Sequence, residues 1–343
     1  MTGTTSDPDR VFGRIVVGVD RRQGGRDALA LAMLLQGVCG GELVALYVYP
    51  YDRTVSLDDA VAVEAVLHED LLAELDEELA HAGVSARPLV VADSFPAHAV
   101  QAVAERDGAD LIVVGAPHRA GAERVLGGDV AAGTMRGAPC AVAVAPAGFA
   151  EREPALTTVG VGFDDSPEST AALRLATRVS GAAGAELHVV SVATGAVAEH
   201  EAAAIAAGAT YEAVNGTPAA ELARRSSDLD LLAVGSRGHG PVRRLLLGST
   251  STRLVREARC PVLIVPRPSA SAAGDEAGSE QRRGAMSERR PLPASTGRSV
   301  VVEEGEDRAD DVLRLVDQEE MSAPLDDVQL GSGQPRGEHA GVA

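Results

Sequence analysis

Residues 230–252 read Asp-Leu-Leu-Ala-Val-Gly-Ser-Arg-Gly-His-Gly-Pro-Val-Arg-Arg-Leu-Leu-Leu-Gly-Ser-Thr-Ser-Thr, and this stretch decides the fold. Its first apolar run ends at Gly235, as buried parallel strands commonly do. Hydroxyl residues from Ser249 onward begin a helix, and a second apolar run follows at Val262 to Val265. Strand, loop, helix and strand form a βαβ unit. A glycine loop that leads into a helix favours anions, because free N–H groups and the helix dipole face the ligand there.

The spacing of the glycines carries further information. Two residues separate Gly235 from Gly238, and nine more lead to Gly248-Ser249. This pattern resembles the nucleotide-binding signature of the universal stress protein family, and it is matched at all four positions. In that family the loop surrounds the ribose and phosphates of ATP. The alternative interpretation is a glycine-rich turn that only connects a strand to a helix.

The resemblance implies a set of binding residues. Gly235 and Gly238 are expected to let the backbone approach the ligand. Ser249 and Thr250 are expected to cap the following helix while offering hydroxyls to phosphate oxygens. From the family alone, the aspartate at 164 is expected to contact the nucleoside, and the backbone at 192 to contact adenine. The implied ligand is ATP, with or without Mg²⁺, and the implied binding residues are Asp164, Val192, Gly235, Ser236, Arg237, Gly238, Gly248, Ser249 and Thr250.

The sequence contains an internal duplication, in which two copies of one unit follow each other. A constant offset of 164 − 20 = 144 maps Asp20 onto Asp164, and later an offset of 235 − 115 = 120 maps Gly115 onto Gly235. The difference, 144 − 120 = 24, is length lost from the middle of the second copy. The first copy has a long acidic amphipathic pattern there, at residues 57–82, and the second has only a short alanine-rich pattern, at 197–207.

The alternation of strands and helices predicts the α/β class, with two tandem five-stranded, parallel, doubly wound domains. The resemblance makes them Rossmann-like and similar to the adenine nucleotide alpha hydrolase fold. The expected domains are 11–148 and 155–267, followed by a disordered tail at 268–343. In a 3-2-1-4-5 strand order, the apolar strands at 141–145 and 262–265 are sheet edges. We expect the two copies to cover each other's edges as a pseudo-symmetric pair within the chain.

Composition excludes several functions. All 31 basic residues among 343 are arginine, so a P-loop lysine and a Schiff-base lysine are both impossible. The formal net charge of −19 disfavours binding to nucleic acids or anionic membranes. Cys39, Cys140 and Cys260 show no metal-binding spacing and suit a reduced compartment, with the last two interpreted as buried apolar residues. With no signal-peptide pattern and no membrane-spanning run, a cytoplasmic location is expected.

The first copy departs from the motif. It has His118 in place of the second glycine and Asp129 in place of Ser249, while Pro117 removes a backbone donor. A side chain fills the space that glycine leaves, and a carboxylate repels phosphate. The sequence therefore predicts that ATP binds only in the second copy.

The sequence does not indicate a catalytic site in addition to the binding site. The run Asp164-Asp165-Ser166 suits a helix cap before Pro167 better than a metal or acid–base site. Arg237, His239, Arg243 and Arg244 either neutralise phosphate or form a solvated face, and the sequence leaves both interpretations open. The favoured function is an ATP-binding stress-response regulator that is not an enzyme, as an intrachain pair or homodimer with an unidentified protein partner. The alternatives are an ATP-hydrolysing or adenylyl-transferring enzyme of related fold, and a structural module without ligand.

Overall fold

The structure is a computed structural model that describes residues 10–50, 57–116, 130–192, 197–236 and 248–266. All of these lie in one of the two units of the chain, Met1–Ala285. The predictions made for His118, Asp129, Arg237 and Gly238 lie outside the described residues, and so does the predicted disorder of the tail. For residues 57–65 and 197–198, only the backbone is described.

The first half of the chain alternates strands and helices, as its apolar periodicities predict. Its elements are β1 (Arg14–Val19), α1 (Gln23–Cys39), β2 (Glu42–Tyr49), α2 (Leu57–His81), β3 (Arg87–Ala92), α3 (Pro96–Asp107), β4 (Leu111–Gly115), α5 (Val130–Met135) and β5 (Ala141–Ala145).

The second half repeats this order after a short 3₁₀ turn, η1 (Phe149–Glu151). Its elements are β6 (Thr158–Gly162), α6 (Pro167–Ala183), β7 (Glu186–Val192), α7 (Val197–Ala206), β8 (Thr210–Val214), α8 (Pro218–Arg225), β9 (Leu231–Gly235), α9 (Ser249–Glu257) and β10 (Val262–Val265).

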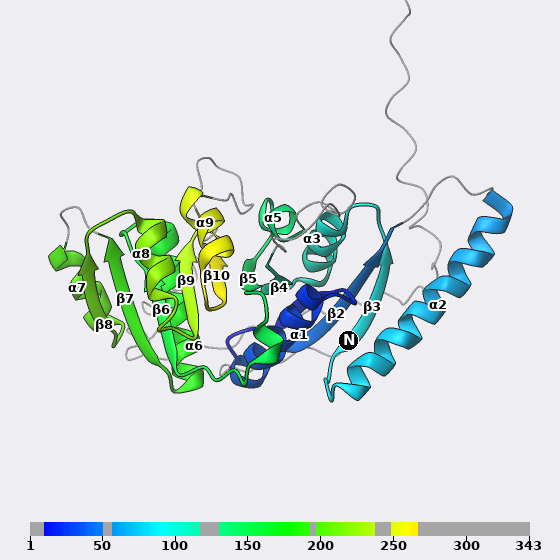
Figure 1. Ribbon diagram of the computed structural model, residues 1–343, viewed down its shortest axis with the longest axis horizontal. Coiled ribbons are helices and arrows are strands. Elements are labelled where there is room, and N and C mark those ends of the chain that lie inside the picture. The colour runs from blue at the N-terminus through cyan, green and yellow to red at the C-terminus, as the bar shows by residue number, and fades with distance from the viewer. Residues whose placement is uncertain (1–9, 51–56, 117–129, 193–196, 237–247, 267–343) are drawn as a thin grey trace, which may run out of the picture. The chain divides into compact units, whose positions relative to one another are not determined.

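The strands form one ten-stranded sheet in the order β3-β2-β1-β4-β5-β10-β9-β6-β7-β8 (Figure 1). Each half has the predicted 3-2-1-4-5 order, and all pairs within a half are parallel. The halves join through β5 and β10, which pair antiparallel with Val144 opposite Val262 and Val142 opposite Ile264. The predicted mutual covering of the two apolar edges is therefore confirmed, since neither edge is left open to other chains.

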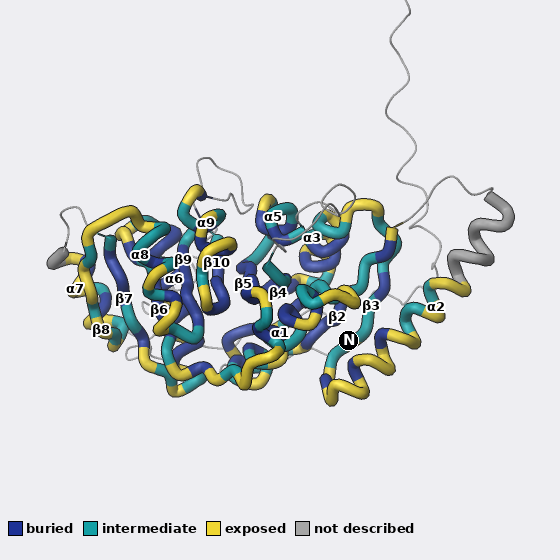
Figure 2. The backbone as a smooth tube through the Cα atoms, in the orientation of Figure 1, coloured by how far each residue is buried: buried dark blue, intermediate teal, exposed yellow. Residues whose placement is uncertain are grey.

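The core consists of two apolar layers, one on each face of the sheet (Figure 2). Successive strand residues alternate between the layers, so Ile15 and Val17 belong to one and Val16 to the other. Helices α1, α2, α6 and α7 contribute to the first layer, and α3, α5, α8 and α9 to the second. The second layer is the one that adjoins the candidate site.

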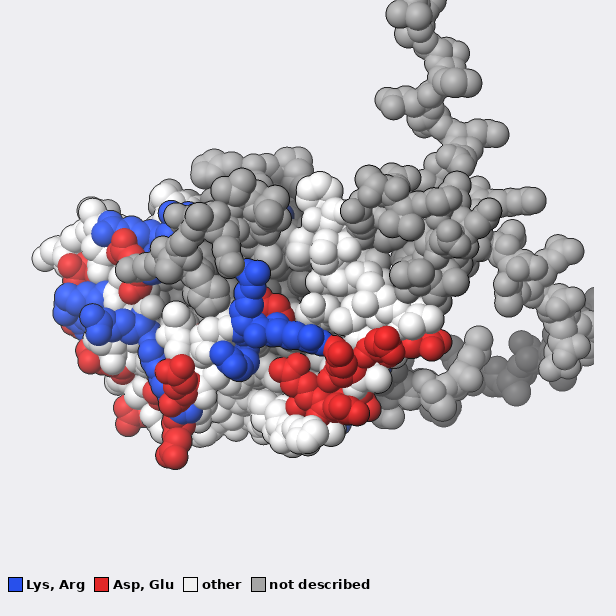
Figure 3. Space-filling view, turned by 45° about the vertical axis from the view of Figure 1, so that its right-hand side comes forward, with Lys and Arg blue, Asp and Glu red and all other residues white. Residues whose placement is uncertain are grey.

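The two halves differ most in the helix after their second strand. Helix α2 spans Leu57–His81, whereas α7 spans only Val197–Ala206, which matches the predicted loss of length. The described exposed side of α2 is acidic, with Glu69, Asp70 and Glu74 on it. Figure 3 shows acidic side chains gathered at the lower right of the face that it draws.

A buried carboxylate ties the connection between the halves to the first half. Asp27 of α1 is 1% exposed, and its two oxygens accept hydrogen bonds from the backbone N–H groups of Gly148 and Ala150, both at 2.9 Å. The side chain of Gln23 donates a third at 3.1 Å. These bonds hold η1 against α1 and give both oxygens of the buried carboxylate hydrogen-bond partners, without which its burial would be costly.

Candidate functional site

A pocket lies at the carboxyl ends of β6, β7 and β9, the expected place for a ligand in a doubly wound sheet. Its volume is about 270 Å³, close to the lower end of the range of roughly 300–1,000 Å³ for small-molecule sites. The described residues that line it are Gly162, Phe163, Asp164, Ser166, Glu168, Ser169, Val190, Val192, Pro218, Leu222, Val234, Gly235, Ser236, Thr250 and Ser251.

Three helices begin at this pocket. Ser166 is the N-cap of α6, Pro218 is the first residue of α8, and Thr250 lies in the first turn of α9. Helix starts carry backbone N–H groups without intrahelical partners and the positive end of the helix dipole. Their convergence favours a ligand with negative charge or with hydrogen-bond acceptors.

One wall of the pocket is apolar. Val190 of β7 and Val234 of β9 come from the two strands that flank β6, and Leu222 covers them from α8; all three are less than 5% exposed. Val192, at the end of β7, is half-buried beside them. A flat aromatic group fits against such a wall, since apolar surfaces line most small-molecule sites.

The strand end at Asp164 and the start of α6 form one hydrogen-bonded turn. The Oδ1 atom of Asp164 accepts bonds from the hydroxyl of Ser166 at 2.6 Å and from its backbone N–H at 3.2 Å. The Oγ atom of Ser166 accepts from the N–H of Ser169 at 3.1 Å, which confirms the helix cap predicted before Pro167. Asp165 has φ of 61°, so it supplies the left-handed residue of the turn.

The start of α9 differs from the prediction. Gly248, and not Ser249 or Thr250, is the N-cap, and no side chain caps this helix. Ser249 is already the first helical residue and is exposed, so its hydroxyl does not reach back to the orphan N–H groups. The expectation that Ser249 and Thr250 cap α9 is therefore wrong. Thr250 lines the pocket together with Ser251, which the sequence did not single out.

Gly235 lines the pocket, and its close packing against α6 leaves no space for a side chain at this position. A Cβ atom at this position would lie 2.7 Å from the Cβ atom of Glu168 and 2.6 Å from its carbonyl carbon. The end of β9 is therefore pressed against the first turn of α6. Gly115 is pressed in the same way against Gly24 in the first half, where an added Cβ would lie 2.3 Å from the carbonyl oxygen. Close helix–strand packing explains this glycine in both halves.

Glu168 and Ser169 are pocket residues that the sequence reasoning missed. Glu168 is 7% exposed although it is ionisable. A signal was present, because the constant offset of 144 places Gly24 opposite Glu168 in the first half. A glycine aligned with an acid at the start of a helix marks a position where the two halves differ in chemistry and not in fold.

The fold brings some of the predicted nucleotide-binding residues together in one place. Asp164, Val192, Gly235, Ser236 and Thr250 line one pocket. Gly248 and Ser249 stand at the helix start beside it. Arg237 and Gly238 lie in the undescribed segment between β9 and α9.

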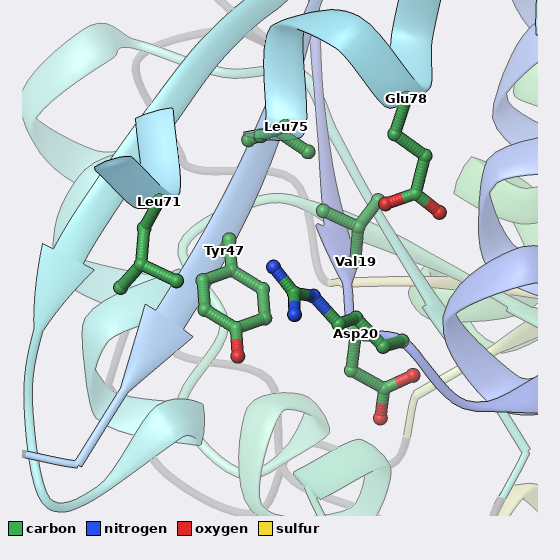
Figure 4. Close-up of a pocket in the computed structure, with 7 residues that line it drawn as sticks. Val19, Asp20, Tyr47, Leu71, Leu75 and Glu78 are labelled. Atoms are coloured by element: carbon green, nitrogen blue, oxygen red, sulfur yellow. The ribbon is translucent and has the colours of Figure 1, made fainter. Parts of the chain in front are cut away.

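The first half has a much smaller cavity at its strand ends, on the side of the sheet that α2 covers. Figure 4 shows Tyr47, Leu71 and Leu75 around it, with Asp20 at its border. The volume is about 10 Å³, about the size that one water molecule occupies. Arg21, which also lines it, forms an ion pair with Glu74. This cavity has no room for a nucleotide.

The thiols do not provide a nucleophile. Burial raises the pKa of Cys140 and of Cys260 to about 12, and that of Cys39 to about 11. At neutral pH all three are protonated and unreactive. No group of three or more His, Cys, Asp or Glu side chains in the described part of the chain is placed to hold a metal ion.

The universal stress protein family model matches residues 12–146 and 194–266, more than half of the chain. The chain belongs to the universal stress protein family. Two matched segments agree with the duplication seen in the sheet. The fold is the α/β, mostly parallel arrangement that the sequence predicts.

Relatives of known sequence and structure agree with this assignment. A universal stress protein of Mycobacterium bovis is 30% identical over 181 residues, which are 46% of this chain and 61% of the relative. This chain covers less than two thirds of the length of such curated relatives. The crystal structure of a universal stress protein from Archaeoglobus fulgidus superposes with a TM-score of 0.60 at 23% identity, covering 74% of this chain and 98% of that one.

A third similar protein is a universal stress protein whose crystal structure was determined in complex with cAMP. The match is 31% identical and covers 33% of this chain and 99% of that one, with a TM-score of 0.28.

None of the helices in the described part of this stress protein has the length and apolar character that a membrane crossing requires.

Proposed function

We propose that this stress protein binds one adenine nucleotide, ATP in particular, in the pocket of its second half. The observation that carries the proposal is the convergence of three helix starts on a cavity of about 270 Å³ next to the glycine motif. Helix starts of this kind bind phosphate groups through backbone N–H donors. The expected units 11–148 and 155–267 then act as a scaffold domain and a binding domain.

The polarity of the pocket gives the ligand an orientation. The adenine ring lies against the apolar wall of Val190, Val192 and Leu222, and the ribose lies near the Asp164 carboxylate. The phosphates extend toward the start of α9, where Thr250 and the N–H groups of the first turn provide donors. Each part of the nucleotide thus meets a surface of matching polarity.

The proposed role is binding without turnover, in a regulatory response to stress. Among the described lining residues, the polar side chains are hydroxyls and the carboxylates of Asp164 and Glu168. Ser166, the hydroxyl closest to a carboxylate, caps α6 and is not placed as a nucleophile. A protein that binds a nucleotide and changes its interactions with another protein requires nothing more than this arrangement.

A pair of matched substitutions tests the location of the site. Val192→Trp fills the pocket from the end of β7, and Val48→Trp makes the same change at the corresponding end of β2, since 192 − 144 = 48. We expect Val192→Trp to weaken the binding of adenosine and ATP at least tenfold in isothermal titration calorimetry, and Val48→Trp to leave it unchanged. Equal loss in both variants, or no loss in either, contradicts the proposal.

A further inference from the structure

A buried polar pair joins α7 to the strands that carry the pocket. Ser191 of β7 is 1% exposed and His200 of α7 is 8% exposed. The Oγ atom of Ser191 and the Nδ1 atom of His200 share a hydrogen bond of 2.6 Å. The ring of His200 also meets the ring of Phe163 edge to face, with the centroids 5.2 Å apart and the planes at 84°. One imidazole therefore contacts β7 through a hydroxyl and the end of the neighbouring β6 through an aromatic ring.

Both contacts lie directly next to the wall of the pocket. Ser191 stands between Val190 and Val192, which both line the pocket, and the alternation of a strand turns its side chain to the other face of the sheet. Phe163 borders the pocket as well, and its backbone N–H donates to the carbonyl of Val190 at 3.0 Å. None of the described lining residues belongs to α7. His200 thus supports the wall from behind, through the strand ends that form it.

The fold does not require this polar pair. The offset of 144 places Tyr47 opposite Ser191 in the first half, since 191 − 144 = 47. The same offset places Val19 opposite Phe163. In the first half, Val19 and Tyr47 lie with leucines of α2 around the small cavity (Figure 4). Apolar side chains therefore close this face of the sheet without burying two polar groups, which are costly to bury unless they are bonded.

We propose that His200 is a positioning residue of the nucleotide pocket. It fixes the spacing of the β6 and β7 ends, and so it couples the attachment of α7 to the binding of the nucleotide. Binding then stabilises α7 against local opening, and a loosened α7 weakens binding, because coupling between two sites is reciprocal. This inference rests on the proposed function, since it concerns what controls the affinity of that same pocket.

The substitution His200→Ala tests the coupling, because it removes both contacts and touches no residue that lines the pocket. We expect it to weaken the binding of adenosine and of ATP with Mg²⁺ at least about fivefold in titration calorimetry, the lower end of the usual coupling between sites. Ser191→Ala is expected to weaken binding in the wild type and to add little in the His200→Ala background, since the two side chains act through one bond.

The matched control is Leu75→Ala. Leu75 is 7% exposed and packs α2 against the first half, so its truncation loosens the corresponding helix. We expect this control to lower Tm but to change both affinities by less than about twofold, because distant sites act independently. A general loss of stability would weaken binding in both variants, whereas a positioning role weakens it only in His200→Ala.

The wild-type protein provides a second measurement that does not depend on the folding of a variant. Hydrogen exchange at the amides of residues 201–206 is followed by mass spectrometry with and without saturating ATP and Mg²⁺. We expect the nucleotide to slow this exchange at least about fivefold, and to leave residues 71–81 of α2 unchanged. The inference is overturned if the nucleotide does not slow exchange in α7, or if His200→Ala binds as tightly as Leu75→Ala. Failure of the wild type to bind adenosine or ATP contradicts the proposed function itself, and so the two failures are distinguishable.

Discussion

The Oδ1 atom of Asp20 accepts a hydrogen bond from the backbone N–H of Gly25 at 2.9 Å. The same oxygen accepts from the N–H of Arg22 at 3.0 Å, so this carboxylate binds the start of the helix that follows it. In the second half, Ser166 caps the corresponding helix, and the Oδ1 atom of Asp164 is bonded to Ser166 instead. Both carboxylates therefore accept from the N–H two residues further on, and they differ in the second bond, which comes from the helix N–H of Gly25 in the first half and from the Ser166 hydroxyl in the second.

The cap of α6 can be tested by Ser166→Ala. This change removes the side-chain oxygen that accepts from Ser169 and the hydroxyl that donates to Asp164. We expect a loss of about 1 kcal/mol of unfolding free energy, which lowers Tm by about 2–4 °C for a protein of this size. Ser227→Ala is the control, because its exposed hydroxyl bonds only within its own turn and to Asp228. An unchanged Tm in Ser166→Ala contradicts the assignment of the cap.

The tie between the halves can be tested by Asp27→Asn. The amide keeps one oxygen but directs an NH₂ group at a backbone N–H of η1, so one buried donor of Gly148 or Ala150 loses its partner. We expect a loss of about 1–3 kcal/mol in urea unfolding, the usual effect of an unsatisfied buried group. Glu153→Gln, an exposed change in the same connection, serves as the control. Equal stability of the two variants argues against this role for Asp27.

The ionisation of Asp230 makes the free energy of unfolding depend on pH. Burial opposes its ionisation, but hydrogen bonds from the side chains and backbone N–H groups of Thr157 and Thr158 outweigh burial, so that its pKa lies below the ordinary value of 3.8. All four bonds end on one oxygen, at 2.6 to 3.1 Å. Because the folded pKa is depressed, this stabilisation is complete above pH of about 4 and is lost as the pH falls through the folded pKa.

The variant Asp230→Asn tests that dependence. We expect it to melt below the wild type at pH 7, and the difference in Tm to shrink as the pH is lowered from 4 toward 2. The measurement is a series of thermal melts followed by circular dichroism. A difference that stays constant over this range shows that the charge of Asp230 does not stabilise the fold.

Much of the fold follows from local pattern. Apolar runs of strand length, each followed by a helical pattern, predicted the strands and helices of both halves. The strand order and the mutual covering of β5 and β10 were predicted from the doubly wound topology that this alternation implies. The Ser166–Pro167 cap was predictable because it depends on neighbouring residues alone.

The site was less predictable, because it depends on which distant residues come into contact. Gly235 was interpreted as a point of ligand approach, yet it also packs against Glu168, 67 residues earlier in the chain (235 − 168 = 67). Gly248 is the N-cap of α9 because the helix begins at Ser249, at least one residue earlier than a cap at Ser249 or Thr250 would allow. The burial of Glu168 arises from the meeting of α6 with β9, which no local pattern records.

The central claim is that one chain holds one nucleotide, in its second half. Titration calorimetry of the full chain with ATP and Mg²⁺ tests it most directly. We expect a stoichiometry near one, and no binding by the double variant Gly238→His, Ser249→Asp, which places the first half's residues in the second half while the protein stays folded. Two equivalent sites per chain, or undiminished affinity in the double variant, would contradict the account.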